Sequence, residues 1–428
     1  MSWEVLLVLI SGRIILFLAN PLICDMQVLR LAGASLTNVG FLMVGLTLMT
    51  LFWSFSYATR VDRGSMSSSL FFFLLLMLLT LLVFFLFDSL FKIYISFELS
   101  VLPIFIIVMG WGYQRERLAA RISLLFYTLT ASMPLLIALV WLRSAASVPG
   151  LHSLFLTNSV NDSKLGLVFM LTIFLAFAVK LPIFGVHMWL PKAHVEAPVI
   201  GSIALAAILL KLGSYGLWLF LPIYCFPIFT GLWVSVSLVG ALSVRVLCLR
   251  LRDLKIIIAY SSVGHMGLIA ASLFMATKVG VRGAIFLILA HGISSSAIFI
   301  IAFVIYQANH SRRLLLTKGV LTWCSTIPLF WFLILIANIA SPPTFNLLAE
   351  VLVITSIVVA NKLNIILIVI VIIASTGYSL IMYSSTIQGV TPLTGSRKAI
   401  SGNELLIFLN HLVWVFLIML RLGALSAN

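Results

Sequence analysis

Apolar residues fill most of this chain in continuous runs that are separated by short polar segments. A helix of about 20 apolar residues spans the hydrocarbon core of a bilayer, whereas a membrane β-strand needs only about 10 alternating residues. The runs are long and do not alternate, so they predict transmembrane helices. The predicted spans are residues 3–19, 36–56, 67–87, 89–110, 121–142, 165–189, 199–220, 227–249, 254–276, 280–305, 318–340, 342–360, 363–386 and 404–423.

One pair of runs is too close together to be two separate crossings. The runs 318–340 and 342–360 are separated only by Ser341, and Pro342 and Pro343 open the second run. This connection is too short to cross the headgroup region and return. Counted as one interrupted span, 318–360 brings the total to about thirteen, and the predicted fold is an all-α polytopic membrane protein.

A second interruption indicates an internal repeat. Pro182 follows Lys180 closely and cannot donate a hydrogen bond to the carbonyl of Ala178, which should therefore be freed in the membrane. Residues 67–220 and 227–386 then each form a five-helix unit whose fourth helix is broken. An odd number of spans inverts the second unit, and paired interruptions in inverted halves indicate a transport site. The predicted organisation is N-terminal helices in 1–66, the two repeats, and a C-terminal helix in 387–428.

Composition and charge agree with a membrane protein. Only 9% of the 428 residues are charged, 63% are hydrophobic, and the mean hydropathy is +1.23. A soluble domain carries about 25% charged residues, so a water-soluble fold is excluded. The net charge of +15 comes from short connections, not from a contiguous basic domain, so lipid headgroups and not nucleic acid are the expected partners.

The basic residues are unevenly distributed between the two sides of the predicted membrane. We number the connections along the chain and count 318–360 as one span. The even-numbered connections then contain more basic residues than the odd-numbered ones. By the positive-inside rule, the even-numbered connections and the C-terminus lie inside and the N-terminus lies outside. Their basic residues are Arg60, Arg63, Arg115, Arg117, Arg121, Lys192, Arg250, Arg252, Lys255, Arg312, Arg313, Lys318, Arg397 and Lys398.

No motif for a metal, a cluster or a redox cofactor is present. The cysteines Cys24, Cys225, Cys248 and Cys324 are isolated, without a CxxC pair or a histidine at ligand spacing, and we interpret them as small apolar filler without disulfides. Nothing resembles a dinucleotide-binding loop or a haem ligand pair. No cleavable signal is apparent, and the first helix is expected at 3–19.

Four charged residues lie in the middle of apolar runs: Glu98, Lys180, Lys211 and Glu350. A charge at the bilayer centre costs about 2.5–3.5 kcal/mol on insertion scales, so such residues usually have a function. Ionisable groups that face one another across a helix bundle are typical of a proton or ion relay. The alternative for each is a static ion pair or an anchor.

Two histidines fall at the centres of adjacent runs. His265 and His291 each have serine and glycine neighbours that admit water, and neutral histidine bridges a donor and an acceptor. We predict a chain that runs from Lys211 through His265 and His291 to Glu350. A core histidine without a relay role is the alternative.

Further polar residues lie at the predicted ends of spans. Asp253 and Lys255 are interpreted as solvated caps at the start of a span. His194 and Glu196, in the connection PKAHVEAP, are either an entry mouth or a polar loop.

The segments WLPKAHVEAPVIGSIALAAILLKLGSYG, FELSVLPIFIIVMGWGYQRERL, LRDLKIIIAYSSVGHMGLI, LILAHGISSS and SPPTFNLLAE resemble the subunit 4 family of mitochondrial NADH:ubiquinone oxidoreductase (respiratory complex I). This family of antiporter-like subunits is related to multisubunit sodium/proton antiporters. The resemblance implies a proton-pumping unit in the mitochondrial inner membrane with no cofactor of its own. NADH, FMN, iron–sulfur clusters and ubiquinone are implied in other subunits, and neighbouring membrane-arm subunits are the implied partners.

The resemblance also implies roles for individual residues. The family's glutamate–lysine pair corresponds to Glu98 and Lys180, and its central lysine corresponds to Lys211. Its two relay histidines and exit-side glutamate correspond to His265, His291 and Glu350.

The N-terminal part departs from the family. The segment before Glu98 is about one helix shorter than usual, so either a helix is lost or residues 20–35, which contain Asp25 and Arg30, form a poor one. This departure concerns the contacts with neighbouring subunits.

Two other functions remain open from the sequence. A stand-alone cation/proton antiporter would use the same residues, and purification with or without redox subunits separates it from a complex I subunit. A structural spacer would gain nothing from buried charges, and apolar substitutions of them would be neutral or stabilising.

Overall fold

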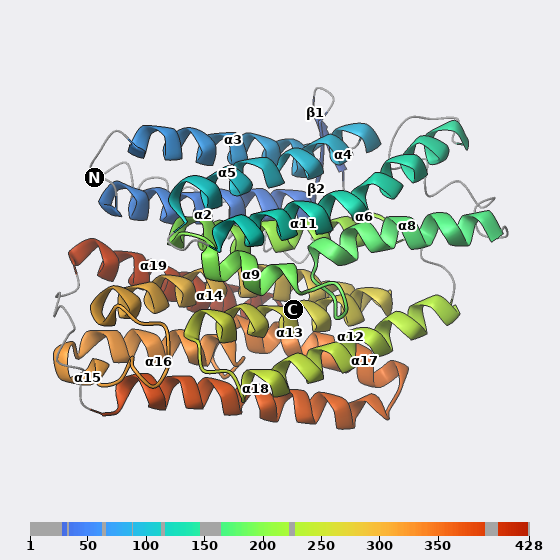
Figure 1. Ribbon diagram of the computed structural model, residues 1–428. Helices are drawn as coiled ribbons and strands as arrows, with labels where there is room; N and C mark the ends of the chain where they lie inside the picture. The colour runs from blue at the N-terminus through green and yellow to red at the C-terminus, as the bar shows by residue number, and fades with distance from the viewer. Residues whose placement is uncertain are drawn as a thin grey trace.

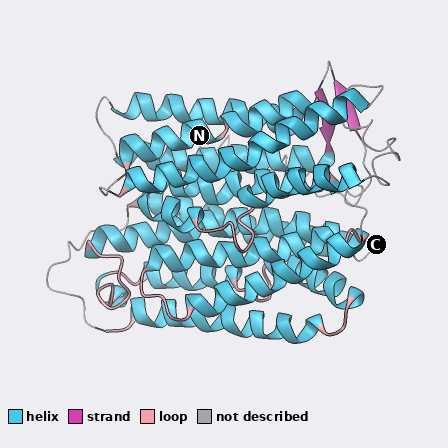
Figure 2. Ribbon diagram, turned by 45° about the vertical axis from the view of Figure 1, so that its right-hand side comes forward, coloured by secondary structure: helices cyan, strands magenta, loops and turns pink. Residues whose placement is uncertain are grey.

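The computed structural model describes residues 28–31, 34–61, 66–87, 89–112, 116–145, 164–221, 227–389 and 401–426. Helices dominate the described part of the chain (Figure 2). They run side by side in two stacks, with the helices of the first half of the chain in one stack and those of the second half in the other (Figure 1). The predicted first span at 3–19 lies outside the described residues.

The helices of the first stack are α2 (Asn38–Val61), α3 (Met66–Leu86), α4 (Leu90–Leu99), α5 (Val101–Trp111), α6 (Arg117–Ala145), α8 (Lys164–Lys180), α9 (Trp189–Glu196), α10 (Val199–Ala204), the π-helical turn η3 (Leu205–Leu209) and α11 (Leu210–Leu219). Those of the second are α12 (Pro227–Cys248), α13 (Leu254–Phe274), α14 (Lys278–Asn309), α15 (Val320–Trp323), α16 (Thr326–Asn338), α17 (Phe345–Ala360), α18 (Asn364–Ile387) and α19 (Gly402–Ser426).

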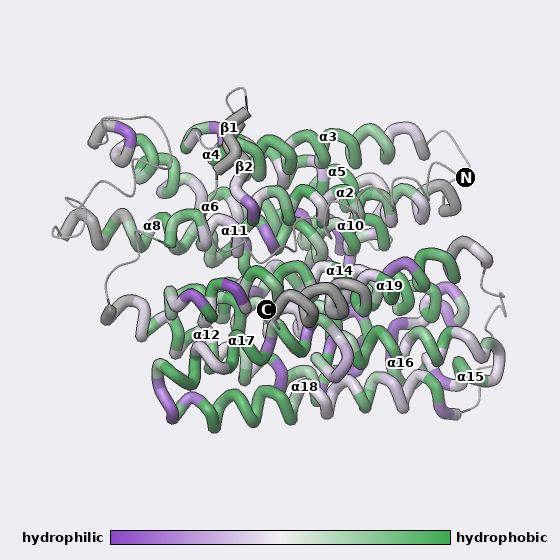
Figure 3. Tube along the Cα trace, turned by 180° about the vertical axis from the view of Figure 1, so that it is seen from behind, coloured by the Kyte–Doolittle hydropathy of each residue, from purple (hydrophilic) through white to green (hydrophobic). Residues whose placement is uncertain are grey.

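The predicted membrane spans correspond to helices wherever the structure describes them. Nine helical segments among the described residues are long and apolar enough to cross a membrane, and four shorter apolar helices accompany them. Hydrophobic residues extend along most of the length of these helices (Figure 3). The all-α polytopic membrane fold is confirmed, whereas the boundaries of the two repeats and the membrane orientation stay predictions.

A small β-hairpin precedes the helices. Strands β1 (Val28–Leu31) and β2 (Ala34–Thr37) pair antiparallel, with Leu29 opposite Leu36 and Arg30 opposite Ser35. The expectation of a poor helix over residues 20–35 is therefore wrong for the described residues of that segment. Two short strands satisfy their main-chain groups by pairing with each other, whereas an isolated helix this short is marginal.

The broken span of the first unit is longer than the sequence pattern indicated. Helix α8 ends at Lys180, residues 181–188 form turns around Pro182, and α9 follows. The break is confirmed, but the predicted end at residue 189 is wrong because that residue begins the second half of the span. The apolar pattern failed here because α9 is short and carries polar residues, including the exposed Lys192.

Carbonyl groups at both breaks accept hydrogen bonds from groups within or beyond the break. The carbonyl of Ala178, expected to be free, accepts a hydrogen bond from the Ile183 N–H at 3.1 Å, and the Val179 carbonyl accepts one from the Trp189 indole at 2.9 Å. In the second unit, Asn346 Nδ2 donates to the Ala337 carbonyl at 2.6 Å across the break between α16 and α17. Irregular backbone in a membrane is stable only where its polar groups are paired in this way.

The centre of the protein lies where the two stacks meet. The segment Val199–Leu219 and helix α14 are the spans with the greatest burial, because every residue of their most apolar window is buried. Helix α14 contacts α10 and η3 in the first stack and α13 and α17 in the second. Side chains in these two windows therefore face protein and not lipid.

Gly213 allows α11 to approach the end of α8. A Cβ atom at this position would lie 2.6 Å from the Leu181 nitrogen and 2.9 Å from the Phe177 carbonyl oxygen, both of them backbone atoms. We expect Gly213→Ala to destabilise the protein by about 1–3 kcal/mol, because backbone cannot shift cheaply to relieve the contact. The unfolding temperature of the purified protein in detergent measures this effect.

Gly110 provides a matched control for this substitution. It lies in α5, and a Cβ atom there would have no neighbour within 4 Å. Gly110→Ala should be neutral or stabilising by up to about 1 kcal/mol. Equal unfolding temperatures for the two variants would contradict a close approach of α11 to α8.

Candidate functional site

Lys211 is fully buried at the start of α11, directly after the π-helical turn η3. The Leu210 N–H bonds to the carbonyl of Leu205, five residues earlier, so the helix is widened just before the lysine. Lys211 Nζ donates to the Ala206 carbonyl at 2.5 Å. Such π-helical turns occur frequently at functional sites, and this one provides a backbone carbonyl as a hydrogen-bond partner for a buried lysine. The sequence pattern predicted a regular span here and missed the turn.

His291 on α14 is the side chain that contacts Lys211. Its Nδ1 lies 3.0 Å from Lys211 Nζ, and both residues are fully buried. A protonated lysine can only donate, so the contact requires an unprotonated Nδ1 on His291. The other ring nitrogen then carries the proton of the neutral imidazole.

The contacts continue from His291 to Glu350. The rings of His291 and His265 have centroids 5.2 Å apart, and His265 Nδ1 lies 3.2 Å from Glu350 Oε1. Glu350, on α17, is only 6% exposed. We refer to Lys211, His291, His265 and Glu350 as the polar line.

The order of the two histidines differs from the predicted one. The sequence analysis placed His265 next to Lys211 and His291 next to Glu350, whereas the contacts run in the reverse order. The reason is tertiary: α14 packs against η3, so its histidine reaches Lys211, while α13 packs against α14 and against α17, where its histidine meets Glu350. Position along the chain does not specify which helix lies between the others.

Glu98 and Lys180 are brought close together without an ion pair. Lys180 Nζ donates to the main-chain carbonyl of Phe97 and lies over the Phe97 ring, 3.1 Å from its centroid. The same carbonyl accepts a hydrogen bond from Ser100 Oγ at 2.7 Å, where α4 gives way to α5. Among the residues that the structure describes, Glu98 Oε1 has no hydrogen-bond partner. Lys180 therefore binds the backbone of Phe97, the residue directly before Glu98, and not the Glu98 carboxylate itself.

Arg245 is a residue that the sequence analysis missed. It is 1% exposed on α12, with Nη2 3.3 Å from His265 Nδ1 and Nη1 donating to the Val371 carbonyl at 3.2 Å. The sequence did offer a signal, because Arg245 lies inside the apolar run 227–249. Arg245 is close to the end of that run, however, so it resembled the basic residues of the connection that follows.

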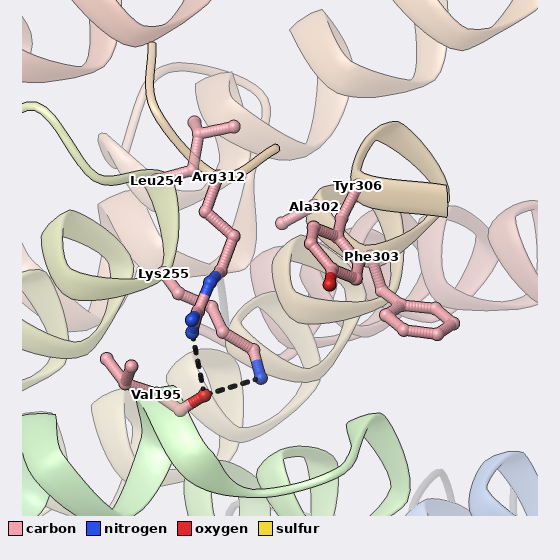
Figure 4. A pocket seen from close by; sticks show the side chains of 7 residues that line it. All are labelled: Val195, Leu254, Lys255, Ala302, Phe303, Tyr306 and Arg312. Atoms are coloured by element: carbon pink, nitrogen blue, oxygen red, sulfur yellow. Dashed lines mark hydrogen bonds between the residues drawn. The ribbon is translucent and has the colours of Figure 1, made fainter. Parts of the chain in front are cut away.

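Lys255 is not the solvated cap that was expected. It points toward the end of α9 and donates to the carbonyls of Val195 at 3.3 Å and Ala197 at 2.8 Å. Arg312 donates to the same Val195 carbonyl at 3.0 Å (Figure 4). Asp253 precedes α13, and its side chain makes no capping hydrogen bond. The cap prediction fails because the buried end of α9 offers Lys255 unpaired carbonyls.

These two cations line a cavity between α9, α13 and α14. Its space of about 30 Å³ is enough for one or two water molecules. The lining residues are Val195, Leu254, Lys255, Ala302, Phe303, Tyr306 and Arg312 (Figure 4).

His194 and Glu196 lie on the buried helix α9, so the interpretation of this segment as a polar loop is wrong. His194 is fully buried and stacks on Phe299, with ring centroids 4.6 Å apart. Neither of its ring nitrogens has a hydrogen-bond partner among the described residues. His194 is close enough to interact electrostatically with both Lys255 and Lys211.

Within the described residues, no three histidine, cysteine or acidic side chains gather in a way that could hold a metal ion. Cys248 and Cys324 are free thiols there, and Cys24 and Cys225 lie outside the described part of the chain.

Comparison with known proteins identifies relatives over most of the chain. The model of the family described as "NADH:quinone oxidoreductase/Mrp antiporter, TM" matches residues 88–376. NADH-ubiquinone oxidoreductase chain 4 of Lumbricus terrestris is 41% identical over 342 residues, which are 79% of this chain and 75% of that protein. The protein of the same name from Polypterus ornatipinnis is 40% identical over 333 residues, 77% of this chain and 72% of the relative.

Two solved structures share the fold. A chain of respiratory complex I from Thermus thermophilus with bound NADH superposes with a TM-score of 0.81 at 21% identity, covering 99% of this chain and 98% of that one. A chain of the membrane-bound sulfane sulfur reductase, an archaeal respiratory membrane complex, also gives 0.81, at 18% identity, covering 98% of this chain and 88% of that one. Together with the family match and the identity to chain 4 proteins, this shows that the chain belongs to the NADH:quinone oxidoreductase/Mrp antiporter transmembrane family.

Proposed function

We propose that this chain translocates protons as a membrane-arm subunit of NADH:ubiquinone oxidoreductase in the mitochondrial inner membrane. The observation that carries the proposal is the polar line, four buried ionisable side chains in sequence at the centre of the protein. The names of the relatives support the assignment to this complex. Oxidation of NADH and reduction of ubiquinone then take place on other subunits, with neighbouring antiporter-like subunits as partners.

Two steps of the polar line, from Lys211 to His291 and from His265 to Glu350, have a donor and an acceptor within hydrogen-bond distance. A proton leaves Lys211 Nζ for His291 Nδ1, and the imidazole releases its other proton toward His265. The ring separation of 5.2 Å suits direct contact or a single bridging water. His265 Nδ1 then passes a proton to Glu350 Oε1.

Glu98 and Lys180 act on this line through their charge. A change in the protonation of Glu98 alters how strongly Lys180 is held, and the field of Lys180 acts on Lys211. Unit charges about 8 Å apart interact by roughly 2 kcal/mol at an effective dielectric near 20, which shifts a protonation equilibrium by roughly thirtyfold. The close approach of α11 to the end of α8 at Gly213 favours this coupling.

Protons enter the line from the cavity beside α9. Lys255 lines that cavity, and His194 interacts electrostatically with both Lys255 and Lys211. The unpaired nitrogens of His194 make it the side chain best suited to connect the two, directly or through water.

The substitution Glu350→Gln tests the proposal. Glutamine keeps the size of the side chain and an oxygen that accepts from His265, but it cannot take up a proton. We expect the rate of proton pumping by the assembled complex in vesicles to fall at least roughly tenfold, with a matching fall in coupled NADH turnover.

Glu404→Gln is the matched control. Glu404 accepts hydrogen bonds from Ser401 at the start of α19, away from the polar line, so the control should pump at the wild-type rate. Wild-type pumping in Glu350→Gln would rule the proposal out. A neutral or stabilising Glu350→Leu would instead indicate a structural spacer.

The family description also names Mrp antiporters, so cation antiport is a second candidate. Purification separates the two: a complex I subunit should copurify with redox subunits, whereas a stand-alone antiporter should not.

A further inference from the structure

Arg245 lies at the Glu350 end of the polar line and is not explained by the relay itself. Its guanidinium group is buried, and the hydrogen bond from Nη1 to the Val371 carbonyl fixes its orientation. Gly264 on α13 leaves room for the Arg245 side chain, because a Cβ atom on Gly264 would lie 3.0 Å from Arg245 Nε. The sequence thus places a permanent positive charge beside His265.

A single nitrogen of His265 faces both a donor and an acceptor. Nδ1 is 3.3 Å from Arg245 Nη2, which only donates, and 3.2 Å from Glu350 Oε1. With a proton on it, Nδ1 donates to the carboxylate and turns an N–H toward a cation. Without the proton, Nδ1 accepts a hydrogen bond from Arg245. The two partners therefore favour opposite protonation states of this nitrogen.

We propose that Arg245 is a positioning residue that drives the proton from His265 Nδ1 to Glu350. This inference rests on the proposed function. In the step, the Nδ1–H bond breaks, an O–H bond forms on Glu350 Oε1, and the carboxylate becomes neutral. Arg245 keeps all its protons, and one of its N–H groups donates to the lone pair that the departing proton leaves.

Distance decides the direction of the effect. The guanidinium group is within hydrogen-bond distance of Nδ1, whereas it forms no ion pair with Glu350 within 4.0 Å. Coulomb repulsion falls with separation, so Arg245 opposes a proton on Nδ1 more strongly than one on Glu350.

The other titratable groups around His265 change their charge during turnover or are ordinarily neutral. They are Lys211 from α11, His291 from α14 and Glu350 from α17, together with Tyr378 from α18, which interacts with Arg245 and Glu350. Arginine is effectively always protonated, so it supplies a bias that does not vary with the state of the line.

Two substitutions in the assembled complex separate this role from a merely structural one. Arg245→Gln keeps a donor for Val371 but removes the charge, whereas Arg245→Lys keeps the charge. We expect Arg245→Gln to lower the rate of proton pumping roughly tenfold, and Arg245→Lys to restore most of it. Arg252→Gln, at an exposed arginine after α12, should pump as the wild type.

The outcomes distinguish failure of the inference from failure of the proposed function. Arg245→Gln pumping at the wild-type rate, or Gln and Lys variants equally impaired, would overturn the role of the charge. Glu350→Gln is measured in parallel: if it is impaired while Arg245→Gln is normal, only this inference fails, and if it is normal, the proposed function fails.

If neither Arg245 variant assembles, the substitution Gly264→Ala provides the test, because the added methyl group crowds Arg245 Nε while the arginine itself stays present. Several-fold slower pumping in Gly264→Ala then supports the role, and unchanged pumping contradicts it.

Discussion

Replacing Lys211 with methionine is expected to abolish proton pumping by the assembled complex. Methionine matches the length and apolar stem of lysine but has no ionisable group. Lys211 is fully buried and is the residue of the polar line that contacts both η3 and His291, so its loss removes the first donor and leaves the His291 nitrogen without that partner. A missing proton-transfer group lowers rates by about 10²–10⁴-fold, which would leave no measurable pumping. The rate of proton pumping is measured as proton uptake by vesicles during NADH oxidation.

Lys362→Met is the control for this substitution. Lys362 is exposed in the turn between α17 and α18, so the same chemical change there should leave pumping unaltered. Removing the buried charge is favourable, whereas leaving the His291 nitrogen without this partner costs about 1–3 kcal/mol, so the two effects oppose each other and the variant should still assemble. A Lys211→Met complex that assembles and pumps normally would exclude the polar line as the proton path.

His291→Phe is expected to have an effect nearly as large. Phenylalanine fills the space of the imidazole but interrupts the line, because the His291 ring is the group that contacts both Lys211 and His265. Pumping in vesicles should fall by about 10²-fold or more. The result also tests the order of contacts, because His291 is the histidine next to Lys211.

His411→Phe is a demanding control because His411 is buried as well. It lies on α19, stacks on Trp53 with centroids 3.6 Å apart, and bonds to Ser296 at 3.1 Å and to the Ile407 carbonyl at 2.7 Å. Its replacement should lower stability by about 1–3 kcal/mol while protons pumped per NADH stay unchanged. Equal losses of pumping in both variants would mean that any buried histidine matters, irrespective of the line.

The sequence was sufficient to identify which side chains are exceptional. Glu98, Lys180, Lys211 and Glu350 stand out because each interrupts a run of apolar residues, and removing a charge from water is costly wherever the chain folds. Pro182 and the prolines after Ser341 located both broken spans for a similarly local reason, since proline lacks an N–H whatever surrounds it. The resemblance to a known family agreed with these residues and was confirmed by the family match.

Other features of the site depended on how distant helices meet. Arg245 was overlooked because a basic residue near the end of a run has the same sequence signature whether it faces headgroups or the core. The buried helix α9 was interpreted as a connection, because its apolar run is too short to register as a span.

By itself, then, the sequence determined the membrane-helical class, the two breaks and the four ionisable residues of the polar line, because desolvation and missing backbone donors are properties of single residues and their neighbours. Only the tertiary structure decided that His291 precedes His265, that Arg245 joins them, and that Lys255 turns toward α9. Those relations depend on the rotation of each helix about its axis and on which helix packs between two others, and both are fixed by contacts between residues far apart in the chain.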